Sequence, residues 1–188
     1  MQELFEGGGV LFREASTFKN AENLSVADDE LTLLMKRFIP RDELHLLPGA
    51  PKKETILDRG VGLNFSLNCP DFLVLCFTDQ LNFRLISDWG AQSAVVINDV
   101  EEFGRRMRAA TRSLISESSA EKLESGRVRY IDPYFPLKSP DVPFCKHFKF
   151  AYQREFRFVI RAKKKLDLSR RKVEIGSIRD IATFVDFD

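Results

Sequence analysis

Residues 148–161 read FKFAYQREFRFVIR, a stretch marked by recurring phenylalanine. Aromatic residues favour extended chain, so we expect a strand through this region. Alternation along a strand would place one apolar set on one face and one polar set on the other. The apolar set is Phe156, Phe158 and Ile160, and the polar set is Gln153, Glu155 and Arg157. We expect the first face to point into the core.

Working outward, the rest of the chain mixes strands with few helices. Residues 72–77 form a continuous apolar run, which indicates a buried central strand. Helices are expected over 28–38, where acidic residues precede an apolar stripe that ends before Pro40, over 80–89, and over 98–113. In the last helix, Val100, Phe103 and Met107 should face the core. Further strands are expected at 10–13, 63–67, 94–97, 128–131, 173–175 and 183–185, with a short helix from Ser177.

This order lacks a regular alternation of strands and helices. It therefore predicts an α+β fold with a largely antiparallel or split sheet and two to four helices. The length of 188 residues suits a single globular domain, 1–188.

Composition excludes several classes of protein. Hydrophobic residues make up 44% of the chain and charged residues 30%, a balance typical of a globular protein. The net charge of +1 creates no global field that would attract nucleic acid or a membrane. No apolar run is long enough to span a bilayer and the N-terminus lacks signal-peptide features, so we expect a cytoplasmic location. His45 and His147 sit in no metal-ligand spacing, and no metal site is expected.

The strongest candidate for chemistry is the pair Gln153 and Glu155. Alternation would point both side chains to the same side, together with Arg157. A structural reading is equally open: a solvated face with an Arg–Glu pair that contributes about 0–1 kcal/mol.

The sequence Gln153-Arg154-Glu155 resembles the Gln-x-Glu signature of ADP-ribosyltransferases of the arginine-serine-glutamate type. That signature precedes or begins a late strand. The family's other signatures are an arginine on an early strand and a Ser-Thr-Ser-like end of a middle strand. Arg13 and Thr78 are the candidates here, although the latter stands in Cys76-Phe77-Thr78 and Arg13 is followed by Glu14 in place of glycine.

The resemblance implies an NAD-dependent mono-ADP-ribosyltransferase that acts as a toxin or defence effector on a protein or nucleic-acid acceptor. Glu155 would stabilise the cationic ribose in the transition state, and Gln153 would orient the acceptor. Arg13 would pair with the phosphates of NAD, Thr78 would hold the ribose, and Tyr152 would stack on the nicotinamide.

A broader resemblance links the chain to uncharacterised proteins of bacteria and their mobile elements. It rests on Leu11-Phe12-Arg13, on Asp28-Asp29-Glu30 and on residues 149–157. It implies a setting in phage defence or a toxin-like role.

The main alternative is a noncatalytic interaction or regulatory protein. The run 161–172 is rich in lysine and arginine, and it could contact a nucleic-acid backbone or an acidic partner. A nuclease is a third reading, but the sequence offers no convincing cluster of metal-binding carboxylates.

Overall fold

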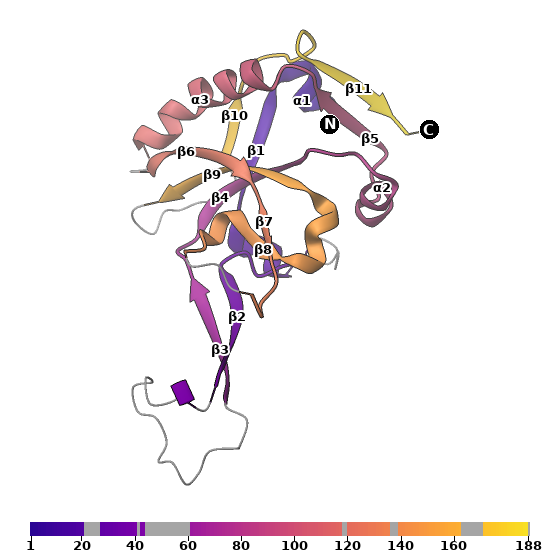
Figure 1. Ribbon diagram of the computed structural model, residues 1–188. Helices are drawn as coiled ribbons and strands as arrows, with labels where there is room; N and C mark the ends of the chain where they lie inside the picture. The colour runs from indigo at the N-terminus through magenta and orange to yellow at the C-terminus, as the bar shows by residue number, and fades with distance from the viewer. Residues whose placement is uncertain are drawn as a thin grey trace.

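A computed structural model describes residues 1–20, 27–40, 42–43, 61–117, 120–135, 139–162 and 171–187. Its centre is a five-stranded sheet in the order β10-β1-β4-β9-β6, and every neighbouring pair is antiparallel (Figure 1). These strands are β1 (Gly9–Glu14), β4 (Phe72–Thr78), β6 (Ala120–Arg127), β9 (Glu155–Ala162) and β10 (Arg171–Glu174). The α+β expectation is confirmed, because helices pack on this sheet without a repeating strand-helix-strand order.

One face of the sheet carries the main apolar core. Phe12, Leu73, Phe158 and Ile160 point to this side and meet α3 (Val100–Glu117). Phe77, Phe103, Phe156 and Phe158 form a chain of tilted and edge-to-face ring contacts with centroids 5.4–6.1 Å apart. Aromatic pairs in this geometry stabilise a core beyond the area that they bury. The phenylalanine-rich strand is therefore a packing element on this side.

The other face of the sheet is covered by irregular chain. The 3-10 helix η1 (Ala15–Asn20) and Leu31 pack over Phe72, Val74 and Val159. The 3-10 helices η4 (Val142–Phe144) and η5 (Phe148–Gln153) lie on the same side, with the short parallel pair β7 (Arg129–Ile131) and β8 (Cys145–His147). This face holds the polar residues of interest.

Smaller elements complete the fold. The helices α1 (Gln2–Gly7) and α2 (Phe83–Trp89) lie on its periphery, and β5 (Ser93–Ile97) pairs with β11 (Ala182–Asp186) (Figure 1). None of the helices in the described ranges is long and apolar enough to cross a membrane.

The helix expected over 28–38 is wrong. Thr32–Ile39 is strand β2, which pairs along its whole length with β3 (Val61–Asn68) in a hairpin that projects from the body (Figure 1). Leu33 and Met35 alternate inward at the strand period, and their burial against Ile131 and Cys145 outweighs the local helical spacing.

Three other expectations also need correction. The strand expected from Phe148 begins only at Glu155, because residues 148–153 form η5. Ser177 starts no helix, and a turn stands at 179–181 instead. Val100 is 61% exposed, whereas Phe103 and Met107 face the core as predicted. Val100 occupies the first helical position after Asp99, whose carboxylate caps the backbone N–H of Glu102 at 2.9 Å.

Candidate functional site

The Gln153-Arg154-Glu155 sequence forms a tight turn between η5 and β9. Arg154 adopts the left-handed conformation with φ 45°, which is unusual for a residue other than glycine. This turn sends the side chains of Gln153 and Glu155 into the protein, where they are 1% and 5% exposed. Arg154 itself points outward. The motif therefore has an inner and an outer side.

On the inner side, Glu155 belongs to a buried ion network. Its carboxylate accepts from Lys146 Nζ at 2.7 Å and from Arg157 Nε at 2.7 Å. Glu30 lies within 2.8 Å of Arg157 and 3.2 Å of Lys146. Gln153 Oε1 also accepts from Lys146 Nζ, at 3.0 Å. Two carboxylates thus face two cations, and the network is neutral.

The electrostatics keep this network ionised. Burial alone would raise the pKa of Glu155, but the charges of Arg157 and Lys146 outweigh it and hold the pKa below its ordinary value. Burial would lower the pKa of Lys146, and Glu30 and Glu155 together raise it instead. The pair of Glu155 and Arg157 is buried. The alternative expectation from the sequence, a solvated face that carries an Arg–Glu pair, is therefore wrong.

The structure brings Thr78 close to Glu155, since the two are direct partners in the β4–β9 register. The Thr78 hydroxyl lies 2.9 Å from both the Gln80 and the Gln153 carbonyl oxygens, so its hydrogen-bonding capacity is used locally. Thr78 ends β4 and Glu155 begins β9, the two positions that the resemblance implies.

Arg13 lies on the same sheet but farther away. It pairs in register with Val74 on β4 and shares that face with Thr78, because residues four apart on a strand point to one side. The four-residue separation corresponds to about 13 Å along the strand. Arg13 is exposed, whereas Glu155 is buried. The two charges do not meet.

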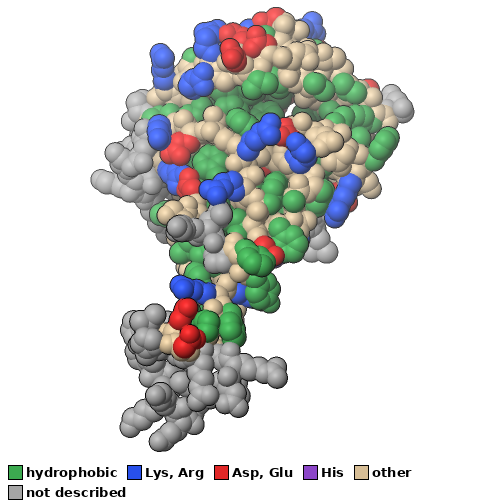
Figure 2. All heavy atoms as spheres, in the orientation of Figure 1, with side chains coloured by type: hydrophobic (Ala, Val, Ile, Leu, Met, Phe, Trp, Pro, Cys, Tyr) green, Lys and Arg blue, Asp and Glu red, His purple; other side chains and the backbone are tan. Residues whose placement is uncertain are grey.

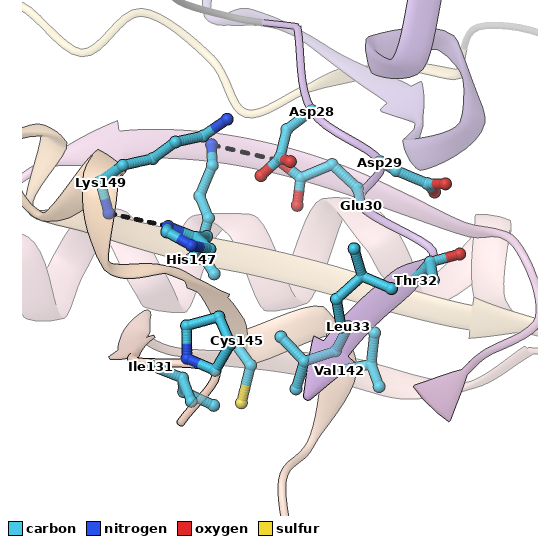
Figure 3. A pocket seen from close by; sticks show the side chains of 13 residues that line it. Asp28, Asp29, Glu30, Thr32, Leu33, Ile131, Val142, Cys145, His147 and Lys149 are labelled. Atoms are coloured by element: carbon cyan, nitrogen blue, oxygen red, sulfur yellow. Dashed lines mark hydrogen bonds and ion pairs between the residues drawn. The ribbon is translucent and has the colours of Figure 1, made fainter. Parts of the chain in front are cut away.

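A cavity of about 250 Å³ adjoins the ion network. It lies between the chain at Asp28–Leu34 and the chain at Cys145–Lys149 (Figure 3). Glu30 and Lys146 belong to both the network and the cavity wall. The cavity is not lined by the candidate site residues Gln153, Glu155, Arg13, Thr78 and Tyr152.

In the described part of the chain, no group of three or more His, Cys, Asp and Glu side chains is placed to hold a metal ion. His45 lies outside the described residues.

The outer side of the turn carries an arginine-rich surface, which we call the arginine–tyrosine surface and define as Arg84, Arg127, Arg154, Tyr152 and Asp79. Asp79 accepts from Arg154 Nε at 2.6 Å and pairs with Arg127 at 3.1 Å. The Arg84 guanidinium lies 3.6 Å from the centre of the Tyr152 ring. The three arginine side chains are 50–72% exposed.

Sequence reasoning missed most partners of this surface and of the network. The sequence pattern indicates a helix start at Glu30 and gives no strong signal for Lys146, Arg84 or Arg127. Several of the contacts join distant segments, as for Glu30 and Arg157, which are separated by 127 positions. A weak signal was present: Lys146 precedes the Gln153-x-Glu155 motif within one short segment.

The basic run 161–172 lies largely outside the described residues, which omit 163–170. At its ends, Arg161 pairs with Asp141 at 2.6 Å and with Glu124 at 3.2 Å, and Lys172 pairs with Glu3 at 2.6 Å. These two cations are therefore neutralised within the chain.

In Figure 2, basic, acidic and apolar side chains are interspersed over the visible face.

Comparisons with protein-family models, with curated proteins and with solved structures found no match.

Proposed function

We propose that the chain is a noncatalytic interaction protein that binds single-stranded nucleic acid at the arginine–tyrosine surface. The observation that carries this proposal is the Arg84 guanidinium over the ring of Tyr152, which precedes Arg154 by two residues, while Arg154 and Arg127 are exposed and share Asp79. Guanidiniums pair with phosphates, and aromatic or guanidinium planes stack on bases of any sequence.

Charge at this surface favours an anionic partner. Among the described residues, Arg84, Arg127 and Arg154 form ion pairs with two carboxylates, Asp79 and Asp88. One positive charge is thus left over. Phe83, next to Arg84 in sequence, is 89% exposed and offers a further ring for stacking.

A noncatalytic role fits the inner side of the same turn. A carboxylate that stabilises a developing cation must present uncompensated negative charge to the substrate. The Glu155 carboxylate forms ion pairs with both cations of the network, Lys146 and Arg157, and the residue is 5% exposed. Its charge is used to hold the fold.

The test is binding of a fluorescein-labelled oligodeoxythymidine of about twelve nucleotides, followed by fluorescence anisotropy at low salt. We expect Arg127→Glu to weaken binding about tenfold and Phe83→Ala to weaken it at least about fivefold. Arg179→Glu is the matched control, because Arg179 is similarly exposed and pairs with Glu6 away from this surface. Equal affinities for wild type, Arg127→Glu and Arg179→Glu would contradict the proposal. An acidic peptide that binds while the oligonucleotide does not would replace it.

A second candidate is the NAD-dependent ADP-ribosyltransferase, acting as a toxin or phage-defence effector. It is favoured by the placement of Arg13, Thr78 and Glu155 on the adjacent strands β1, β4 and β9 and on one face of the sheet. Incubation with labelled NAD and cell lysate tests it. The informative variant is Arg13→Ala, because Arg13 is exposed and its loss should leave the fold intact. Label transfer that disappears in Arg13→Ala and persists in Arg179→Ala would support this enzyme and overturn the noncatalytic proposal.

A further inference from the structure

The hairpin that projects from the body has an open edge along strand β3 (Figure 1). Among the described residues, β2 is the strand that pairs with β3, so the opposite edge of β3 has no described neighbour. Gly62, Asn64, Ser66 and Asn68 are all exposed on this strand. An open strand edge presents backbone donors and acceptors to another chain.

The hydrogen-bond pattern shows which residues face the open edge. The Cys69 N–H donates to the Leu31 carbonyl at 3.0 Å, and these two residues continue the β2–β3 register by one position. Bonded positions recur at every second residue of an antiparallel pair, so the odd-numbered residues of β3 bond to β2. The Lys36 N–H has the phase that this pattern requires, because it donates away from β3, to the Pro133 carbonyl at 2.7 Å. The even-numbered residues of β3 therefore direct their N–H and C=O groups to the open edge.

The sequence of β3 does not protect this edge. Val61–Asn68 reads VGLNFSLN, without a charged residue or a proline. The edge strands of the main sheet differ, because β6 carries Lys122 and Glu124, and β10 carries Lys172 and Glu174. Charges and prolines on an edge strand oppose pairing with another chain. Their absence from β3 favours pairing with a strand that is itself uncharged.

A second copy of β3 has the required backbone pattern. Two copies can run antiparallel about a two-fold axis that passes through Phe65. Asn64 of one copy then lies opposite Ser66 of the other, and Gly62 lies opposite Asn68. All of these residues direct their backbone groups to the open edge, and each pair would exchange two hydrogen bonds.

The apolar face of β3 matches in the same register. Leu63 of one copy would lie opposite Leu67 of the other, and the two Phe65 rings would lie opposite each other. Phe65 is 37% exposed, so its ring has area left to bury. Cross-strand pairs of aromatic and aliphatic side chains stabilise a sheet. Polar residues thus face polar ones and apolar residues face apolar ones along the strand.

We propose that the chain forms a two-fold homodimer in which β3 pairs with β3 of a second copy, so that the two hairpins join into one sheet. A single strand pair is a small interface, and we expect a dissociation constant of about 10–100 µM. The interface includes no residue of the arginine–tyrosine surface, and the dimer stands or falls independently of nucleic-acid binding.

Sedimentation equilibrium of the full chain tests the dimer. Asn64→Pro removes an N–H that faces the open edge and should weaken dimerisation at least about tenfold. Asn64→Ala is the matched control, because it keeps this N–H and should change the dissociation constant less than about threefold. Circular dichroism of each variant checks that the fold is retained.

Two outcomes of this measurement would overturn the proposal. One is a wild type that stays monomeric up to about 500 µM, and the other is a folded Asn64→Pro that dimerises as tightly as the wild type. Binding of an alternating threonine–valine peptide to such a monomeric wild type would assign the edge to a different partner.

Cysteine crosslinking tests the register and stays decisive if Asn64→Pro does not fold. The two copies of position 65 lie about 4.5 Å apart between their Cα atoms, which is within disulfide range, and the two copies of position 63 lie more than about 13 Å apart. Mild oxidation should therefore link Phe65→Cys into a covalent dimer through position 65 and should not link Leu63→Cys through position 63. Mass spectrometry of the linked peptides identifies the position, and the wild type with its free cysteines is the background control. Linkage of both variants, or of neither, would contradict this pairing.

Discussion

A single residue, Arg154, separates the two roles of the motif. Its left-handed conformation points Gln153 and Glu155 inward and leaves its own guanidinium on Asp79 outside. Glu155 and Arg157 share one face of the regular strand β9, and this face is buried because Glu30, Pro143 and Lys146 from other segments cover it. The residue pattern therefore predicts that the two side chains lie together, but it does not specify the distant segments that bury them.

Glu155 should act as a structural residue. Glu155→Ala leaves Lys146 and Arg157 buried with one carboxylate between them, and we expect a loss of about 3–5 kcal/mol in the free energy of unfolding. Urea unfolding followed by circular dichroism measures this loss. Glu174→Ala is the control: its ion pair with Lys172 is exposed and should contribute less than about 1 kcal/mol. If Glu155→Ala lowered the free energy of unfolding no more than Glu174→Ala, a stabilising role of the network would be contradicted.

The same network predicts a dependence of stability on pH. The folded protein lowers the pKa of Glu155, so the unfolded chain takes up this proton first as the pH falls. The stabilisation by Glu155 is complete above the ordinary pKa of 4.5 and is lost as the pH falls through the lower, folded value. Urea unfolding of wild type and Glu155→Gln at several pH values measures it. The wild type should lose stability in acid more steeply than the variant, and parallel curves would contradict this.

At the scale of elements, local patterns predicted the sheet better than its surroundings. The apolar run 72–77 became the central strand β4, and 98–113 became most of α3. The helix predicted over 28–38 is wrong because residues 32–39 form a strand through pairing with the distant strand β3. Strand β6 went unpredicted, since Ala120–Arg127 is polar and is held by its ladder with β9. Tertiary pairing decided both cases.

The junction of α1 and β1 depends on a close approach of two backbones. Gly8 has φ 73°, and a Cβ there would overlap the carbonyl of Gly176 after β10. We expect Gly8→Ala to lower the free energy of unfolding by about 2–5 kcal/mol, from conformational strain and overlap together. Gly90→Ala is the matched control, because Gly90 has φ 58° with open space around it. It should cost only about 1–2 kcal/mol. Thermal unfolding that ranks the two equally would refute the role of Gly176.

At the scale of the whole molecule, the sheet divides the protein into an apolar side and a polar side. The phenylalanine cluster and α3 occupy the first, and the ion network, the cavity and the η5 turn occupy the second. The sequence predicted the fold class and the region of interest around Gln153–Glu155. It did not predict the cavity or the arginine–tyrosine surface, because both join segments that are distant in the chain, such as Asp79 with Arg154.

The most direct measurement of the central claim is the salt dependence of oligonucleotide affinity. Each phosphate contact on a single strand contributes a slope of about 0.7 in log K against log salt, so three guanidiniums predict a slope of about 2 between about 50 and 200 mM NaCl. Arg127→Ala should reduce this slope by about 0.7, and Arg179→Ala should leave it unchanged. A wild-type slope near zero, or an equal reduction in both variants, would contradict binding at the arginine–tyrosine surface.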